Sequence, residues 1–214
     1  MLFRSWLVAN EFFDALPIRQ FIRDGQAWRE KRIGRTQGEL TFGLGPLTPQ
    51  PALDHRKADT EDGDLVETCE ATAPIVAQLA QRIASHGGAA LIIDYGDWRA
   101  LGDTLQALRG HKSTDPLSDP GQADLTAHVD FEALALTAKT AGCTYGRVTP
   151  QGVFLERLGI TARAQTLATA LSGPDSNSLI AAHQRLTHPQ EMGNLFKVLG
   201  LFPQQATPPP GLNA

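Results

Sequence analysis

The sequence predicts an α/β fold in which a parallel sheet carries an antiparallel insertion. Two short apolar runs, residues 7–9 and 89–93, are typical of strands in such a sheet. The second run follows an amphipathic helical pattern and a Gly87-Gly88 break, which is the order expected of a right-handed strand, helix, strand crossover. Between the runs, glycines separate short apolar stretches in the manner of hairpins.

The loop after the first run holds the densest polar chemistry. Five residues follow residues 7–9 directly: Asn10, Glu11, Phe12, Phe13 and Asp14. Ligands of open α/β sheets bind outside the carboxyl ends of the strands, so this loop is the first candidate site. Its polar groups can accept hydrogen bonds from a cationic or amide-like group that the aromatic rings hold in place. The alternative is that Phe12 and Phe13 belong to the core and Asp14 starts a turn.

Residues 17–64 predict an insertion of hairpins followed by an exposed connection. Glycines punctuate residues 17–44, and three prolines occur within residues 45–64. A basic cluster surrounds Trp28 in this insertion: Arg19, Arg23, Arg29, Lys31, Arg32 and Arg35. The cluster indicates either a solvated face or a patch for an acidic partner or a nucleic-acid backbone.

A helix is predicted from Thr72 to the Gly87-Gly88 break, because apolar residues recur on one face. Residues 89–93 then form a strand that ends at Asp94 and Tyr95. Since both predicted strands are parallel members of one sheet, we expect Asp94 beside Asn10 at the same end.

Residues 111–130 form a second chemically dense stretch, in which His111 and His128 lie among several carboxylates. No chelating spacing such as His-x-x-x-His occurs, so hydrogen-bonded histidines and turn-forming acids are favoured over a metal site.

Residues 101–109 fit either a strand or a short helix. After Asp130, which can cap a helix ending at Gly142, the expected elements are a strand over 144–158 interrupted at Pro150, helices over 160–171 and 178–186 within a 159–190 helical insertion, an edge strand over 195–202 and a flexible tail over 203–214.

Composition sets broad limits on the class of protein. The chain has 214 residues, 42% hydrophobic residues and a net charge of -4, as expected of a soluble globular protein without a general affinity for anionic surfaces. The apolar runs are too short to cross a membrane, and residues 1–6 hold no signal-peptide core. Cys69 and Cys143 lie far apart, which indicates neither a disulfide framework nor a zinc site.

Five ordered motifs together resemble the MidA family of class I S-adenosylmethionine-dependent methyltransferases. They are Asn-Glu-Phe-Phe-Asp-Ala-Leu-Pro at 10–17, Ile-Asp-Tyr-Gly at 93–96, Gly-His at 110–111 with Asp-Pro-Leu at 115–117, Pro-Gly at 120–121 with Asp-Leu-Thr-Ala-His-Val-Asp-Phe at 124–131, and Met-Gly at 192–193 with Phe-Lys-Val-Leu at 196–199. This family includes the mitochondrial protein arginine methyltransferase that assists respiratory complex I assembly. The resemblance implies a Rossmann-like sheet with antiparallel β insertions and extra helices.

The resemblance covers the later half of the family's domain, so residues 1–202 are expected to form a partial methyltransferase domain. No stretch supplies the family's Gly-rich loop or the acid that ends its second strand, which in such folds contact the cofactor. The resemblance therefore implies a fragment that, alone, binds S-adenosylmethionine poorly. The bare flank of the first strand would also favour association, with a homodimer as one outcome.

The resemblance also implies roles for individual residues. The expected cofactor-binding residues are Asn10, Phe12 and Asp94. Glu11 and Asp14 are expected to pair with an arginine guanidinium, since carboxylates bind this group in a fork, and His128 is the candidate proton acceptor. Methyl transfer to nitrogen mainly requires that the nucleophile be positioned and water excluded.

The implied function is protein arginine N-methylation with S-adenosylmethionine, on a substrate that the resemblance links to respiratory complex I. It also implies the cytoplasm of a bacterium, or the mitochondrial matrix for eukaryotic relatives, and no membrane partner. Two alternatives remain: a non-catalytic binding or assembly module, and a nucleic-acid amino-methyltransferase. The acidic net charge and the lack of an Asn-Pro-Pro-aromatic loop argue against the second alternative.

Overall fold

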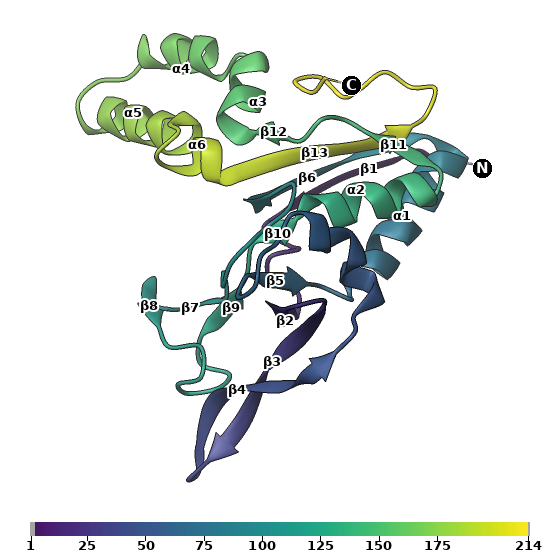
Figure 1. Ribbon diagram of the computed structural model, residues 1–214. Coiled ribbons are helices and arrows are strands. Elements are labelled where there is room, and N and C mark those ends of the chain that lie inside the picture. Colours follow the sequence, from purple (N-terminus) through teal and green to yellow (C-terminus); the bar gives the residue numbers. More distant parts are fainter. Residues whose placement is uncertain (1–2, 214) are drawn as a thin grey trace. The chain divides into compact units, whose positions relative to one another are not determined.

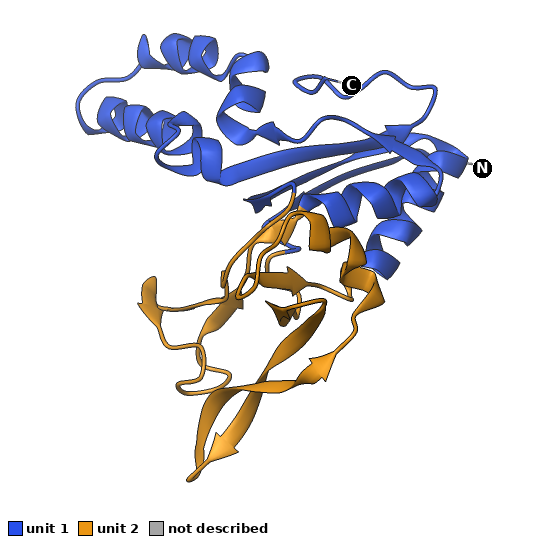
Figure 2. Cartoon of the chain, viewed as in Figure 1, with its two compact units in different colours: residues 1–13, 72–98, 131–214 blue, residues 14–71, 99–130 orange. Residues whose placement is uncertain are grey.

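A computed structural model describes residues 3–213 of the protein. The chain forms two compact units, coloured separately in Figure 2. Unit 1 comprises the described residues of 1–13, 72–98 and 131–214, and unit 2 comprises residues 14–71 and 99–130. The insertion predicted over residues 17–64 thus lies in unit 2, together with residues 99–130. Met1, Leu2 and Ala214 lie outside the described residues.

Unit 1 is built on a mixed sheet with the strand order β1 (Ser5–Asn10), β6 (Gly88–Asp97), β13 (Phe196–Pro203) and β11 (Cys143–Tyr145). β1 and β6 are parallel, and Asn10 lies opposite Ile93. The predicted pair of parallel strands, with Asn10 and Asp94 at one end, is therefore confirmed. β1 pairs with a single strand among the described residues, and its Trp6 and Val8 side chains are exposed.

The Gly87-Gly88 break has a steric basis at the start of β6. Gly88 has a φ of +112°, and a Cβ atom there would lie 1.9 Å from the Ser5 carbonyl oxygen. Only glycine adopts this backbone conformation readily and permits so close an approach. The break is thus required for β6 to pair with β1.

Helices cover both faces of this sheet (Figure 1). On one face lie α1 (Thr72–His86) and α2 (Phe131–Thr140), which begin where the sequence predicts. Their apolar faces bury Ile83 and Leu134. The other face carries α3 (Gln151–Arg157), α4 (Ile160–Ala168), α5 (Pro174–Thr187) and α6 (Met192–Leu195). No helix among the described residues is long and apolar enough to span a membrane.

Two predictions for the C-terminal part of unit 1 were wrong. Residues 144–158 form two short strands, β11 and β12 (Thr149–Pro150), followed by helix α3. The apolar run at 153–155 mimics a strand, but it is helical because Phe154 packs into a cluster with Val198 and Leu212. β13 lies between β6 and β11 rather than at the sheet edge, in keeping with its burial on both faces.

The predicted tail folds back onto unit 1. Leu212 is buried against Phe154 and Val198, and the Asn213 carbonyl accepts a hydrogen bond of 3.1 Å from the Arg147 N–H. These contacts depend on side chains far away in sequence. The composition of residues 203–214, which is rich in proline, does not reveal them.

Unit 2 contains two antiparallel sheets. The larger has the strand order β4 (Glu39–Thr48), β3 (Ala27–Thr36), β2 (Arg19–Asp24) and β5 (Leu65–Thr68), which confirms the predicted hairpins. The smaller has the order β8 (Lys112–Thr114), β7 (Gln106–Arg109) and β9 (Asp124–Thr126), so the open choice for residues 101–109 resolves as a strand over 106–109 only. β10 (Val129–Asp130) ends the unit.

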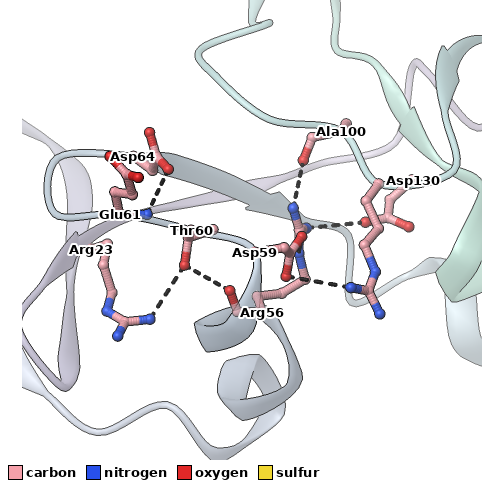
Figure 3. A network of polar contacts seen from close by, with 9 residues as sticks. Arg23, Arg56, Asp59, Thr60, Glu61, Asp64, Ala100 and Asp130 are labelled. Atoms are coloured by element: carbon pink, nitrogen blue, oxygen red, sulfur yellow. Dashed lines mark hydrogen bonds and ion pairs between the residues drawn. The ribbon is translucent and has the colours of Figure 1, made fainter.

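Arg56 lies in η1 (Pro51–Ala58), a 3-10 helix within the connection that the sequence predicts to be exposed. Its side chain is almost completely buried, and Figure 3 shows it beside Asp59, Asp130 and Ala100. It contacts Asp59 Oδ2 at 3.0 Å, Asp130 Oδ2 at 3.5 Å and the Ala100 carbonyl at 3.2 Å. A buried charge with such partners ties η1 to the 99–130 segment.

Candidate functional site

The candidate loop begins with a sharp turn at the end of β1. The Glu11 N–H donates a hydrogen bond of 3.0 Å to the Ile93 carbonyl, which extends the pairing with β6 by one residue. Glu11 has a φ of +49°, in the left-handed region that residues other than glycine seldom adopt. Backbone strain of this kind concentrates at functional sites, where surrounding contacts maintain it.

Asp94 supplies those surrounding contacts. Its side chain has no solvent exposure, and Oδ2 accepts hydrogen bonds from the Phe12 N–H at 3.2 Å and the Phe13 N–H at 3.1 Å. Oδ1 accepts a further bond of 3.0 Å from the Tyr95 N–H. Because bonds to a charged acceptor are stronger than neutral ones, the buried carboxylate fixes the loop on the end of β6.

The loop presents three side chains and buries one. Phe13 is 4% exposed, whereas Phe12 is 46% exposed, and their rings meet edge to face with centroids 5.1 Å apart. Asn10 and Glu11 are exposed, and Asn10 Nδ2 donates to Glu11 Oε1 at 3.2 Å. The core alternative thus holds for Phe13 but not for Phe12. A carboxylate, a carboxamide and an aromatic ring remain available at the carboxyl ends of β1 and β6.

Asp14 and His128 lie together in unit 2. The buried Asp14 accepts a hydrogen bond of 3.0 Å at its carbonyl from the Ala127 N–H. The next N–H, that of His128, donates to Thr104 Oγ1 at 2.8 Å. The predicted site residues therefore form two groups: Asn10, Glu11, Phe12 and Asp94 in unit 1, and Asp14 and His128 in unit 2.

Sequence reasoning missed Thr104 and its partner Glu67. Thr104 contacts the backbone of His128, 24 residues away, and the side chain of Glu67, 37 residues away. A threonine within the 101–109 stretch, which fits either a strand or a short helix, carries no local signal of such contacts. Only the fold brings these residues together.

The basic cluster of the insertion is largely paired with carboxylates. Arg19 contacts Glu30 at 2.7 Å and Glu70 at 2.5 Å, and Arg32 contacts Glu30 at 2.6 Å. The hydrogen bond from Arg19 lowers the pKa of Glu30, with Arg32 adding to the effect. Positive charge satisfied within the unit is less available to phosphates, so the structure favours a solvated face over a nucleic-acid patch.

A comparison with protein families decides the assignment. The family model described as "Putative S-adenosyl-L-methionine-dependent methyltransferase" matches residues 2–149, more than half of the chain. The chain belongs to this methyltransferase family. The predicted resemblance is thereby confirmed, and the Asp94-held loop lies within the matched part of this family member.

Curated relatives match nearly the whole chain. The mitochondrial protein arginine methyltransferase NDUFAF7 of Xenopus tropicalis is 39% identical over 213 residues, covering 96% of this chain and 49% of its own length. The protein of the same name from Mus musculus is 38% identical over 206 residues, covering 94% of this chain and 46% of its own length. The chain thus spans about half the length of the curated relatives it matches.

A solved structure has the same fold. A protein from Burkholderia thailandensis, crystallised with bound S-adenosyl-homocysteine, superposes with a TM-score of 0.77 at 29% identity. The alignment covers 94% of this chain and 54% of that protein. The predicted α/β methyltransferase fold with antiparallel additions is confirmed.

Proposed function

We propose that this chain takes part in the S-adenosylmethionine-dependent N-methylation of arginine side chains in a protein substrate. The observation that carries the proposal is the loop at the carboxyl ends of β1 and β6, where Asp94 holds the backbone and Glu11 and Phe12 remain exposed. Membership of the methyltransferase family supports the reaction, and the names of the curated relatives support arginine as the acceptor.

Glu11 is the proposed partner of the substrate guanidinium. Its carboxylate is exposed, its backbone is fixed by the bond to Ile93, and Asn10 orients one of its oxygens. A carboxylate held in this way binds a guanidinium in a fork and directs one nitrogen. Phe12 offers an apolar surface beside it, on which the planar cation can stack.

The other predicted site residues keep distinct proposed roles. Asn10 and Phe12 are proposed to contact the cofactor, since a carboxamide and an aromatic ring suit its polar and planar parts. Bound S-adenosylmethionine would supply the electrophilic methyl group. The contacts of Asp94 support a role in shaping the loop; direct cofactor binding by Asp94 stays a prediction. Asp14 and His128 are proposed as a second carboxylate and a proton acceptor, respectively.

The family resemblance supports a specific kind of substrate. We propose a subunit of respiratory complex I, because the motifs at 10–17 and 93–96 resemble a family that includes the arginine methyltransferase that assists complex I assembly. The relatives named above are mitochondrial, whereas a bacterial cytoplasm is the proposed location for this chain.

The experiment is a methyl-transfer assay on the natural full-length protein with labelled S-adenosylmethionine and arginine-containing protein substrates. Glu11→Gln removes the charge but keeps the shape, and is expected to lower kcat/KM by about 100-fold, as loss of an oriented charge-assisted contact does. Glu191→Gln, an exposed change elsewhere in unit 1, serves as the matched control. Equal activity of both variants would contradict the role of Glu11. Cofactor binding without any transfer would favour the binding-module alternative.

A further inference from the structure

The segment that carries His128 is fixed by two hydrogen bonds from successive backbone groups. The Ala127 N–H donates to the Asp14 carbonyl, and the His128 N–H donates to Thr104 Oγ1. One acceptor is a main-chain carbonyl, but the other is a side-chain hydroxyl. The orientation of His128 therefore depends on how Thr104 itself is held.

Glu67 of β5 holds Thr104 at two points. The Thr104 N–H donates to Glu67 Oε1 at 3.0 Å, and the Thr104 hydroxyl donates to Glu67 Oε2. Since the hydroxyl hydrogen is directed at the carboxylate, a lone pair of the same oxygen is left to accept from His128. Successive hydrogen bonds of this kind are cooperative, because each bond polarises the next.

Glu67 is in turn a well-anchored buried carboxylate. It is 5% exposed, and Gln20 Nε2 of β2 donates to its Oε1 at 2.7 Å. Gln20 Nε2 also contacts Asp103 Oδ1 at 2.7 Å, and Asp103 pairs with Lys31 of β3 at 2.5 Å. The network thus connects β2, β3 and β5 of the larger sheet to Thr104 and to its neighbour Asp103.

We infer that Thr104 and Glu67 are positioning residues that set the placement of His128 for methyl transfer. They act through the His128 backbone rather than on substrate. This inference rests on the proposed function for the role of His128, but the positioning itself is a property of unit 2. Two of the hydrogen bonds that the buried Glu67 carboxylate accepts come from Thr104. The carboxylate therefore fixes the position of this threonine directly.

Hydrogen exchange tests the positioning independently of activity. In Thr104→Val the isosteric side chain has no acceptor, so exchange at the His128 amide should accelerate by about tenfold. Thr104→Ser keeps the hydroxyl and should retain the wild-type rate. The Ala127 amide, whose acceptor is a main-chain carbonyl, provides the internal reference. Mass spectrometry with electron-transfer fragmentation resolves the two amides. An unchanged His128 rate in Thr104→Val overturns the inference.

Kinetics of the full-length protein test the functional half. Thr104→Val should lower kcat by at least tenfold with little change in KM, Thr104→Ser should restore it, and Thr36→Val, an exposed change in the same unit, should have no effect. Placed on a His128→Ala background, Thr104→Val should cause no additional loss. An additional loss of similar size would show that Thr104 acts on the fold and would overturn the inference.

Two other results can be told apart from a failure of the positioning: no methyl transfer by the wild-type protein, and a Thr104→Val variant that does not fold. If the wild-type protein transfers no methyl group, the proposed function fails while the exchange result still decides the positioning. If Thr104→Val does not fold, Glu67→Gln supplies the test. The neutral glutamine weakens the hydrogen bonds that hold Thr104, because it replaces a charged acceptor. Exchange at His128 should then rise about threefold relative to Ala127, and an equal rise at both amides would overturn the inference.

Discussion

Replacing Asp94 by asparagine should disrupt the loop that carries Glu11 and Phe12. The buried carboxylate accepts three backbone N–H bonds, two at Oδ2 and one at Oδ1. In Asp94→Asn one oxygen becomes an NH2 group, which cannot accept, so at least one of these three N–H groups loses its partner. Bonds to a charged acceptor contribute about 1.5–3 kcal/mol each, and the remaining bonds weaken when the charge is lost. The expected loss of stability is about 2–4 kcal/mol.

Scanning calorimetry measures this loss as a fall in Tm of roughly 4–16 °C for a protein of this size. Asp97→Asn is the matched control, since this exposed aspartate lies on the same strand and, within the part of the chain that the structure describes, accepts a bond only from the adjacent Trp98 N–H. Faster amide exchange at Phe12 and Phe13 would localise the effect to the loop. If Asp94→Asn and Asp97→Asn unfold within about 2 °C of each other, the carboxylate does not hold the loop and the reasoning fails.

Two further predictions concern the framework around the site. Gly88→Ala should cost about 3 kcal/mol or more in urea unfolding, because its Cβ would lie against the Ser5 carbonyl at a positive φ, whereas Gly34→Ala, in open space, should stay within about 0.5 kcal/mol of wild type. Burial opposes ionisation of Asp103, but the hydrogen bonds from Lys31 and Gln20 outweigh it and lower the pKa of Asp103 below the usual 3.8. A lowered folded-state pKa stabilises the protein above the unfolded pKa, and this contribution is lost as the pH falls through the folded value. Asp103→Asn should therefore destabilise the protein at about pH 7 but not at about pH 2.5, and a difference that persists in acid would contradict this origin.

The frame of unit 1 could be predicted because its signals are local. The apolar run at 89–93, the glycines before it and the amphipathic face from Thr72 each specify one element, and parallel pairing with residues 7–9 follows from the handedness of crossovers. The loop at Asn10 follows from the same logic, since parallel strands end at a common edge.

The remaining features depend on contacts distant in sequence. Residues 153–155 read as a strand, but burial of Phe154 beneath Leu212 selects a helix. Glu67 of β5 and Thr104 are 37 residues apart, and their contact has no local signal in the sequence. Likewise, the carboxylates that neutralise Arg19 come from Glu30 and Glu70, which a linear scan of charge does not assign to it.

Product analysis of the natural full-length protein tests the central claim most directly. After incubation with S-adenosylmethionine and a candidate protein substrate, mass spectrometry locates the added methyl group. We predict methylation on an arginine nitrogen, with the yield reduced by about 100-fold in Glu11→Gln and unchanged in Glu191→Gln. Methyl groups found only on another residue type or on nucleic acid, or equal yields in the two variants, would contradict it.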